Sequence, residues 1–294
     1  MTAEPVSLRQ RALPVAVLLL AMLLLWYAGA VGLNAAGAIE RVLAPQGAYA
    51  TADLISATLN MQRPVLPAPH QVAADLYNSL VDWPLDSPRN LAYHAAITAQ
   101  STLVGFALGT LLGIALAAAI VHSRTLDRAL LPWIVASQTV PVLAIAPIVL
   151  VILGSLGFEG VAPKAAIAMY LCFFPVTVAM VAGLRAPQRI ETELMHTYAA
   201  SHWQAFWLLR LPSALPFLFP SLRVAIAAGV VGAMVAELPT GAQAGLGARL
   251  LTGSYYGNTV GIWSALVMSA LLGLGLTAAV AGIERLVLRQ RRVP

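Results

Sequence analysis

The chain has 294 residues, of which 60% are hydrophobic and 10% are charged, and its mean hydropathy is +0.81. Ordinary soluble domains carry about 25% charged residues, so this composition excludes a water-soluble globular protein. The net charge of +5 does not indicate a nucleic-acid partner, because the basic residues form short clusters between apolar runs. Such clusters orient membrane proteins by remaining on the cytoplasmic side.

Six apolar runs are long enough to cross a bilayer, whose hydrocarbon core of about 30 Å needs roughly 20 helical residues. Inside lipid, only helices and closed barrels satisfy their own backbone polar groups, and these runs lack the alternation of barrel strands. The sequence therefore predicts an all-α polytopic membrane protein with about six transmembrane helices. The predicted spans are residues 12–35, 96–121, 129–153, 164–184, 218–238 and 260–284.

The first run also has features of a cleaved signal peptide, because basic residues precede it and small residues follow. Signal peptides have apolar cores of about 7–15 residues, whereas residues 12–33 carry no charge, so we expect a retained anchor. In the long segment that follows, apolar residues at helical spacing predict a short amphipathic helix over residues 71–83 on the outer membrane surface. A loosely ordered loop is the alternative. We divide the chain into residues 1–90, an anchor with an external segment, and residues 91–294, a five-helix core.

The basic residues predict the orientation of the chain, because cytoplasmic loops carry the excess of Lys and Arg. With the N-terminus inside, the external basic residues are Arg41, Arg63, Arg89, Lys164 and Arg249. The cytoplasmic ones are Arg9, Arg11, Arg124, Arg128, Arg185, Arg189, Arg210, Arg223, Arg285, Arg289, Arg291 and Arg292. Both termini are therefore predicted to be cytoplasmic.

Small and charged residues distinguish two places in the predicted core. Gly105, Gly109 and Gly113 repeat every fourth residue and so share one helix face, which predicts close helix packing. The lining of a solute pathway is the alternative for this face. Glu237 ends the fifth run before a loop rich in small residues, and a carboxylate there is a candidate for gating or solute passage. Contact with water or capping of the next turn is the alternative. The histidines lie near predicted membrane edges without metal-ligand spacing, so no metal site is predicted.

The longest predicted cytoplasmic connection, residues 185–217, combines polar, aromatic and proline residues. One short helix is predicted from about 188 to 198. A second is predicted from about 201 to 211, closed by Pro212 and Pro216 because proline interrupts helices.

The second of these helices carries an aromatic cluster. Ser201 is a suitable N-cap, and helical spacing brings Trp203, Phe206, Trp207 and Arg210 close to one face. Aromatic and Arg side chains are typical of protein interfaces. A belt of aromatic residues in the lipid headgroups is the alternative.

This connection resembles the loop shared by permeases of binding-protein-dependent ABC importers. The family pattern is Glu-Ala-Ala, three residues, Gly, nine residues, Ile, one residue and Leu-Pro. The positions that correspond to it are Glu193, Leu194, Met195, Ala199, Leu209, Leu211 and Pro212. Leu-Met is bulkier than Ala-Ala, and Ala199 has less freedom than glycine. Alanine is tolerated at this position if the bend there uses a negative φ.

The resemblance extends over most of the chain from about Leu66. It is greatest to the branch that imports sulfonates, taurine, nitrate and certain vitamin precursors. The segments that carry it are LPAPHQV, QTVPVLAIAPIVLVILG, FFPVTVAMVAGL and AELPTGAQAGLGARL. The resemblance implies the fold of a type I ABC importer permease, in which the loop docks on an ATPase.

By this resemblance, Ser201 to Trp207 form the docking helix, framed by Glu193 and Pro212. The full set of predicted coupling residues is Glu193, Ala199, Ala200, Ser201, His202, Trp203, Phe206, Trp207, Leu211 and Pro212.

The resemblance implies a permease subunit in the bacterial inner membrane that is not itself an enzyme. Its implied partners are a second copy of the chain, a cytoplasmic ATPase dimer and an external solute-binding protein. The chain lacks a phosphate-binding loop motif, so ATP and Mg are expected on the ATPase and no cofactor on this chain. The expected solute is a small organic anion or a heterocyclic vitamin precursor.

Two other functions compete with this interpretation. An ion-coupled secondary transporter would need intramembrane ionisable residues and often shows repeated halves, and neither is apparent in the sequence. A membrane scaffold without transport activity would not need the spacing of the loop.

Overall fold

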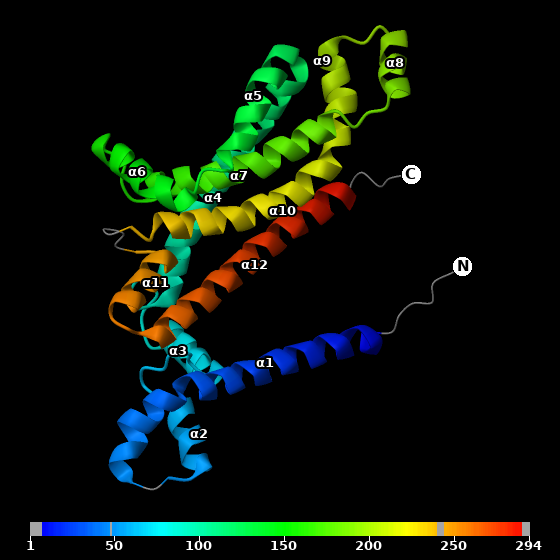
Figure 1. Ribbon diagram of the computed structural model, residues 1–294. Helices are drawn as coiled ribbons and strands as arrows, with labels where there is room; N and C mark the ends of the chain where they lie inside the picture. The colour runs from blue at the N-terminus through cyan, green and yellow to red at the C-terminus, as the bar shows by residue number, and fades with distance from the viewer. Residues whose placement is uncertain (1–7, 48, 240–243, 290–294) are drawn as a thin grey trace. The chain divides into compact units, whose positions relative to one another are not determined.

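The computed structural model describes residues 8–47, 49–239 and 244–289, and every regular element in them is helical (Figure 1). The all-α prediction is confirmed for this part of the chain. In chain order the helices are α1 (Leu8–Ala38), η1 (Ile39–Leu43), η2 (Ala44–Gln46), α2 (Thr51–Leu59), α3 (Pro69–Val81), α4 (Leu91–His122), α5 (Arg124–Ser137), α6 (Val142–Ser155), α7 (Val161–Leu184), α8 (Arg189–Thr197), α9 (His202–Ala205), η3 (Phe206–Arg210), α10 (Leu211–Ala236), α11 (Leu246–Tyr255) and α12 (Thr259–Arg289). Arg291, Arg292 and residues 240–243 of the loop after Glu237 lie outside the described residues.

Within the described residues, five helical segments are long and apolar enough to cross a membrane, and they overlap five of the six predicted spans. These segments are Leu13–Leu43, Leu91–His122, Val161–Leu184, His202–Ala236 and Thr259–Val287. The predicted orientation of the termini stays a prediction.

The predicted span at 129–153 is not one straight helix. Its residues belong to α5 and α6, which are bent by 102° at the short break between Ser137 and Val142. Pro141 explains the break, because proline lacks an N–H and disfavours helical geometry in the residue before it. Pro132 and Pro147 lie inside the two helices without ending them. The pair is a broken span or a re-entrant segment.

The predicted amphipathic helix at 71–83 is confirmed as α3, and the alternative of a loose loop is wrong. Its placement on the outer membrane surface stays a prediction. Side-chain caps mark other helix ends: Ala92 N–H donates to Asn90 Oδ1 over 2.8 Å at the start of α4, and Leu126 N–H donates to Ser123 Oγ over 3.3 Å at the start of α5. Such caps satisfy N–H groups that have no partner within the helix.

The chain forms two compact units by its internal contacts, Met1–Leu85 with Leu250–Leu266, and Asp86–Arg249 with Val267–Pro294. In the second unit, α7 packs against both α4 and α10, and α6 packs against α7 (Figure 1). The centre of this core includes Cys172, Val176 and Met180 of α7, all fully buried.

The predicted glycine face of α4 is confirmed as a packing surface. A Cβ atom at Gly105 would lie 2.5 Å from Ala168 Cβ, and one at Gly109 would lie 2.6 Å from Cys172 Cβ. At Gly113 the nearest atom would be the backbone oxygen of Phe173, at 2.9 Å. Contacts below 3 Å with backbone or Cβ atoms cannot be relieved by a side-chain rotation, so only glycine allows α4 and α7 to approach this closely.

In the first unit, polar contacts fix the segment before α3 against α1. Asn34 is buried, accepts from Val65 N–H over 2.7 Å and donates to Leu66 O over 2.8 Å. Trp26 donates to Pro67 O over 3.0 Å, and its ring lies 5.0 Å from that of Trp263. The apolar side chains of α1 from Leu13 to Leu25 are exposed, as expected for a helix that faces lipid.

Candidate functional site

The predicted coupling loop forms a hairpin of two short helices between α7 and α10 (Figure 1). The first predicted helix is confirmed as α8. The predicted N-cap at Ser201 is also confirmed: Gln204 N–H donates to Ser201 Oγ over 3.2 Å, and Ser201 N–H donates to Gln204 Oε1 over 2.8 Å. These reciprocal bonds satisfy two N–H groups at the start of α9.

The prediction that Pro212 and Pro216 close the second helix is wrong. The helix continues from α9 through η3 into α10, so residues His202–Ala236 form one long segment. The reason lies in η3, a π-helical turn in which Leu211 N–H donates to Phe206 O, five residues back. This wider turn changes the hydrogen-bond register immediately before Pro212, so the helix passes a proline that lacks an N–H donor.

Ala199 does not meet the condition of a negative φ under which alanine replaces glycine easily. Its φ is +52°, the one positive value among the described residues other than glycine. Ala200 N–H donates to Met195 O over 3.0 Å, and Ala199 N–H donates to His196 O over 2.9 Å. This is the Schellman arrangement that ends helices and prefers glycine. Ala199 thus has the left-handed geometry that glycine would adopt at this family position, at the steric expense of its Cβ.

The aromatic cluster of the hairpin is held by one buried residue. Phe206 is buried, and its ring lies 5.1 Å from His122 of α4. Trp203 and Trp207 flank it with ring centroids 6.0 and 5.5 Å from that of Phe206, yet their side chains are 66% and 48% exposed. The cluster therefore joins the hairpin to the core and presents two tryptophans at the surface.

Sequence reasoning missed a second apolar row on this hairpin. Ile190 and Leu194 on α8 and Tyr198 just after it are 70%, 55% and 77% exposed. Their spacing of four residues, which places them on one helix face, was the available signal. On the same helix, Glu193 accepts a 2.8 Å hydrogen bond from Arg189 and remains exposed.

A buried polar cluster surrounds Glu237 at the other end of α10. Glu237 is fully buried, and the Thr98 hydroxyl of α4 lies 3.0 and 2.9 Å from its two carboxylate oxygens. Gly247 N–H donates to Glu237 Oε2 over 2.9 Å, and Lys164 Nζ of α7 lies 3.7 Å from Oε1. A buried carboxylate needs such donors, because an unpaired buried charge is costly.

The same cluster fixes the backbone that leads into α11. Lys164 donates to Ala244 O over 2.7 Å, and Leu246 N–H donates to Thr98 Oγ1 over 2.9 Å. Gly245 N–H donates to His94 Nδ1 over 3.0 Å. His94 Nε2 must then carry the proton and donate to Pro88 O over 2.8 Å.

Sequence reasoning singled out only Glu237 among the members of this cluster. Lys164 was found only as a basic residue of the external side, which stays a prediction, and His94 only as one of the histidines near a membrane edge; both are buried. Thr98 gave no signal at all, because a threonine within a span commonly bonds to its own helix. Only the folded arrangement brings α4, α7 and the end of α10 together.

The comparisons with known proteins agree with this architecture. The family described as the binding-protein-dependent transport system inner membrane component matches residues 109–292. The chain belongs to this family. A crystal structure of an amino acid ABC transporter with histidines shares the fold, with a TM-score of 0.54 and 14% sequence identity over 68% of this chain and 93% of that chain.

Several curated relatives are permeases of the same kind. The formylaminopyrimidine transport permease ThiX of Halalkalibacterium halodurans is 34% identical over 81% of this chain and 90% of its own length. The riboflavin transport permease RibX of Chloroflexus aurantiacus is 32% identical over 76% of this chain and 80% of its own. The taurine transport permease TauC of Escherichia coli is 28% identical over the same shares.

The chain is accordingly the membrane-spanning permease subunit of an ABC importer, a multi-pass inner-membrane protein. Its relatives are transport components rather than enzymes, and they favour this function over an ion-coupled transporter. Membership of a binding-protein-dependent family implies an ATPase and a solute-binding protein as partners.

Proposed function

We propose that the hairpin of α8 and α9 is the surface on which the ATPase drives this permease. The observation that carries the proposal is that exposed tryptophans stand on a helix that continues without a break into α10. Displacement of Trp203 and Trp207 would therefore move α10 directly. The exposed row on α8 enlarges the same surface, and such aromatic side chains are typical of the centre of protein interfaces.

The transport cycle that we propose follows from the position of this hairpin at one end of α10. Two copies of the chain enclose a pathway along their two-fold axis, and two ATPases lie below. Closure of the ATPases on ATP and Mg moves the hairpins and opens the pathway outward, and hydrolysis resets it. No cofactor is assigned to the permease itself, and an external solute-binding protein delivers the solute.

Glu237 is the proposed gating residue, and it follows the end of α10 that is opposite the hairpin. The 26 residues of α10 span about 39 Å at a rise of 1.5 Å per residue. Its carboxylate is engaged with Thr98, Lys164 and Gly247. We therefore propose that it acts by holding three segments in one arrangement rather than by touching the solute. Movement of α10 would then require this cluster to rearrange.

We propose that the solute is a small organic anion or a heterocyclic vitamin precursor. Two relatives that are more than 30% identical carry names that specify heterocycles, formylaminopyrimidine and riboflavin. A relative at lower identity is named for taurine, which carries an anionic sulfonate group. Uptake of labelled solutes of these classes into cells that express the complete importer tests the proposal, and transport of neither class would contradict it.

The coupling proposal is tested by pull-down of the tagged chain from detergent-solubilised membranes. The variant Trp203→Ala with Trp207→Ala should lose a co-purifying ATPase that the wild type retains. The control is Trp133→Ala on α5, a tryptophan that is 76% exposed and lies outside the hairpin. Equal recovery of the ATPase with the double variant would contradict the assignment of the hairpin. Absence of an ATPase from the wild type under mild conditions would contradict the importer mechanism.

A further inference from the structure

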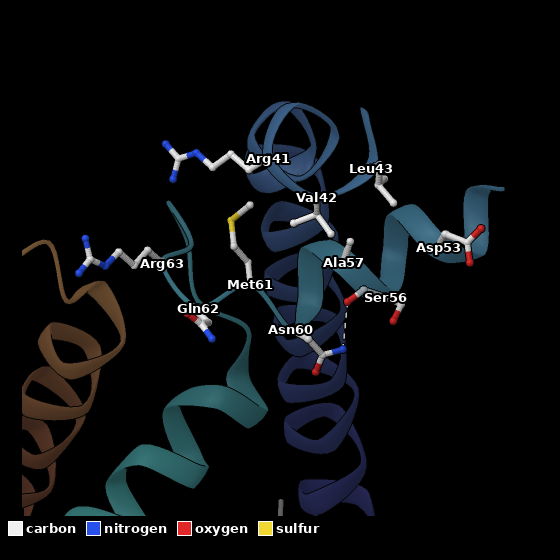
Figure 2. Close-up of a pocket in the computed structure, with 10 residues that line it drawn as sticks. All are labelled: Arg41, Val42, Leu43, Asp53, Ser56, Ala57, Asn60, Met61, Gln62 and Arg63. Carbon is white, nitrogen blue, oxygen red and sulfur yellow. Dashed lines mark hydrogen bonds between the residues drawn. The ribbon is translucent and has the colours of Figure 1, made fainter. Parts of the chain in front are cut away.

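A pocket of about 650 Å³ lies in the first compact unit (Figure 2). It is formed by the π-helical turn η1 after α1, by α2 and by the segment 60–63 that follows α2. None of these residues belongs to the coupling loop or to the stretch matched by the family.

Two arginines give this pocket an uncompensated positive charge. Arg41 and Arg63 both line it, and their guanidinium groups point to the same side in Figure 2. Among the described residues, neither guanidinium lies within 4.0 Å of a carboxylate. Asp53, the one acidic lining residue, lies on the opposite side and accepts a 2.9 Å hydrogen bond from Ala50 N–H.

Polar contacts hold the lining segment in place. Asn34 bonds to Val65 and Leu66, and the Thr259 hydroxyl donates to Pro64 O over 2.6 Å, directly beside Arg63. Gln71 donates to Met61 O over 3.0 Å. The backbone that carries Arg63 is therefore positioned before any ligand binds, which lowers the entropy lost on binding.

The remaining lining residues are amphipathic. Gln62 adds an amide with no partner among the described residues, whereas Asn60 donates to Ser56 O over 2.9 Å. Val42 and Met61 provide apolar surface beside the arginines. Guanidinium groups bind phosphate oxygens in a bidentate manner, and such bonds are among the strongest in proteins.

We propose that this pocket binds a phosphate-type oxyanion through Arg41 and Arg63. The oxyanion has two possible sources. Arg41 lies in the last turn of the candidate span Leu13–Leu43, where the long side chain of an arginine reaches the lipid headgroups, and the apolar lining suits the glycerol and upper acyl chain of a phospholipid. A free phosphate from the external solution would use the same donors without the apolar contacts.

The test uses the full-length chain in detergent with two probes at equal ionic strength. Native mass spectrometry measures binding of phosphatidylglycerol against phosphatidylcholine, and calorimetry measures binding of inorganic phosphate. The pocket variant is Arg41→Gln with Arg63→Gln. The matched control is Arg124→Gln with Arg128→Gln on α5, two exposed arginines that likewise have no ion pair among the described residues.

We expect at least about tenfold weaker binding in the pocket variant and unchanged binding in the control, because two charge-assisted hydrogen bonds are lost. A loss confined to phosphatidylglycerol identifies the lipid as the source, and a loss for phosphate with no lipid preference identifies the free anion. The variant Arg41→Lys with Arg63→Lys keeps the charge and should weaken binding less, which separates ligand loss from misfolding.

Two results would overturn the proposal. One is equal weakening in the pocket and control variants, which would mean a general attraction of lipid to positive charge. The other is wild-type binding of both probes by the pocket variant. If the pocket variant also loses a co-purified solute-binding protein in that case, the pocket is a protein-docking surface instead.

Discussion

Replacing Lys164 with methionine removes the cation beside Glu237 and leaves the carboxylate buried with only the Thr98 and Gly247 donors. Breaking a buried ion pair in this way costs about 3–5 kcal/mol. The pair distance of 3.7 Å and the 10% exposure of the Lys164 side chain favour the lower end of that range. About 3 kcal/mol corresponds to a fall in Tm of about 6–12 °C for a chain of this size.

The double variant Lys164→Met with Glu237→Gln is the critical comparison. It removes both charges, and glutamine keeps an acceptor for the N–H of Gly247, so we expect a Tm within about 4 °C of the wild type. Thermal unfolding of the full-length permease in lipid nanodiscs, with solute uptake in parallel, measures both effects. A Tm for Lys164→Met within 2 °C of the wild type, or a double variant less stable than the single one, would refute the reasoning.

Three further perturbations test other parts of the structure. Gly109→Ala should lower the Tm by several degrees, because the added methyl group overpacks the contact with α7 at a cost of about 1–3 kcal/mol. Gly275→Ala is the control, because open space surrounds that position, and its Tm should not fall. Equal effects of the two variants would contradict the packing argument. Ala199→Gly should stabilise α8 by up to about 1 kcal/mol, because a φ of +52° is strained for alanine. Hydrogen exchange of the α8 amides should therefore become slower, and unchanged or faster exchange would contradict this. Glu284→Gln should lower the free energy of unfolding by about 1 kcal/mol, because it removes the negative charge that pairs with Arg223. The exchanged pair Arg223→Glu with Glu284→Arg should recover part of that loss, and no recovery would argue against the ion pair.

Local sequence information was sufficient for the elements that depend on composition and spacing. The apolar runs predicted six spans, five of which overlap single helices long enough to cross a membrane in the described residues, and the glycines at every fourth position predicted the packing face of α4. These succeed because a bilayer imposes helix length and apolarity on each segment separately. The loop spacing likewise predicted the family that the comparisons show.

Proline positions were a weaker guide, because their effect depends on what the neighbouring turns do. Pro141 ends a helix and bends the third run by 102°. Pro212 does not end one, because a π-helical turn precedes it and changes the hydrogen-bond register. The sign of φ at Ala199 was equally undetermined, since the Schellman bonds of α8 impose it.

The sequence by itself determined the membrane class, five of the helical spans, the short helix α8 and the family, since each depends on residues close together in the chain. Only the tertiary structure brought together Thr98 of α4, Lys164 of α7 and Glu237, the residue that follows α10. It also placed Arg41 beside Arg63 in one pocket. Contacts between distant segments follow from how helix surfaces fit one another, and single-sequence periodicity carries no information about that fit.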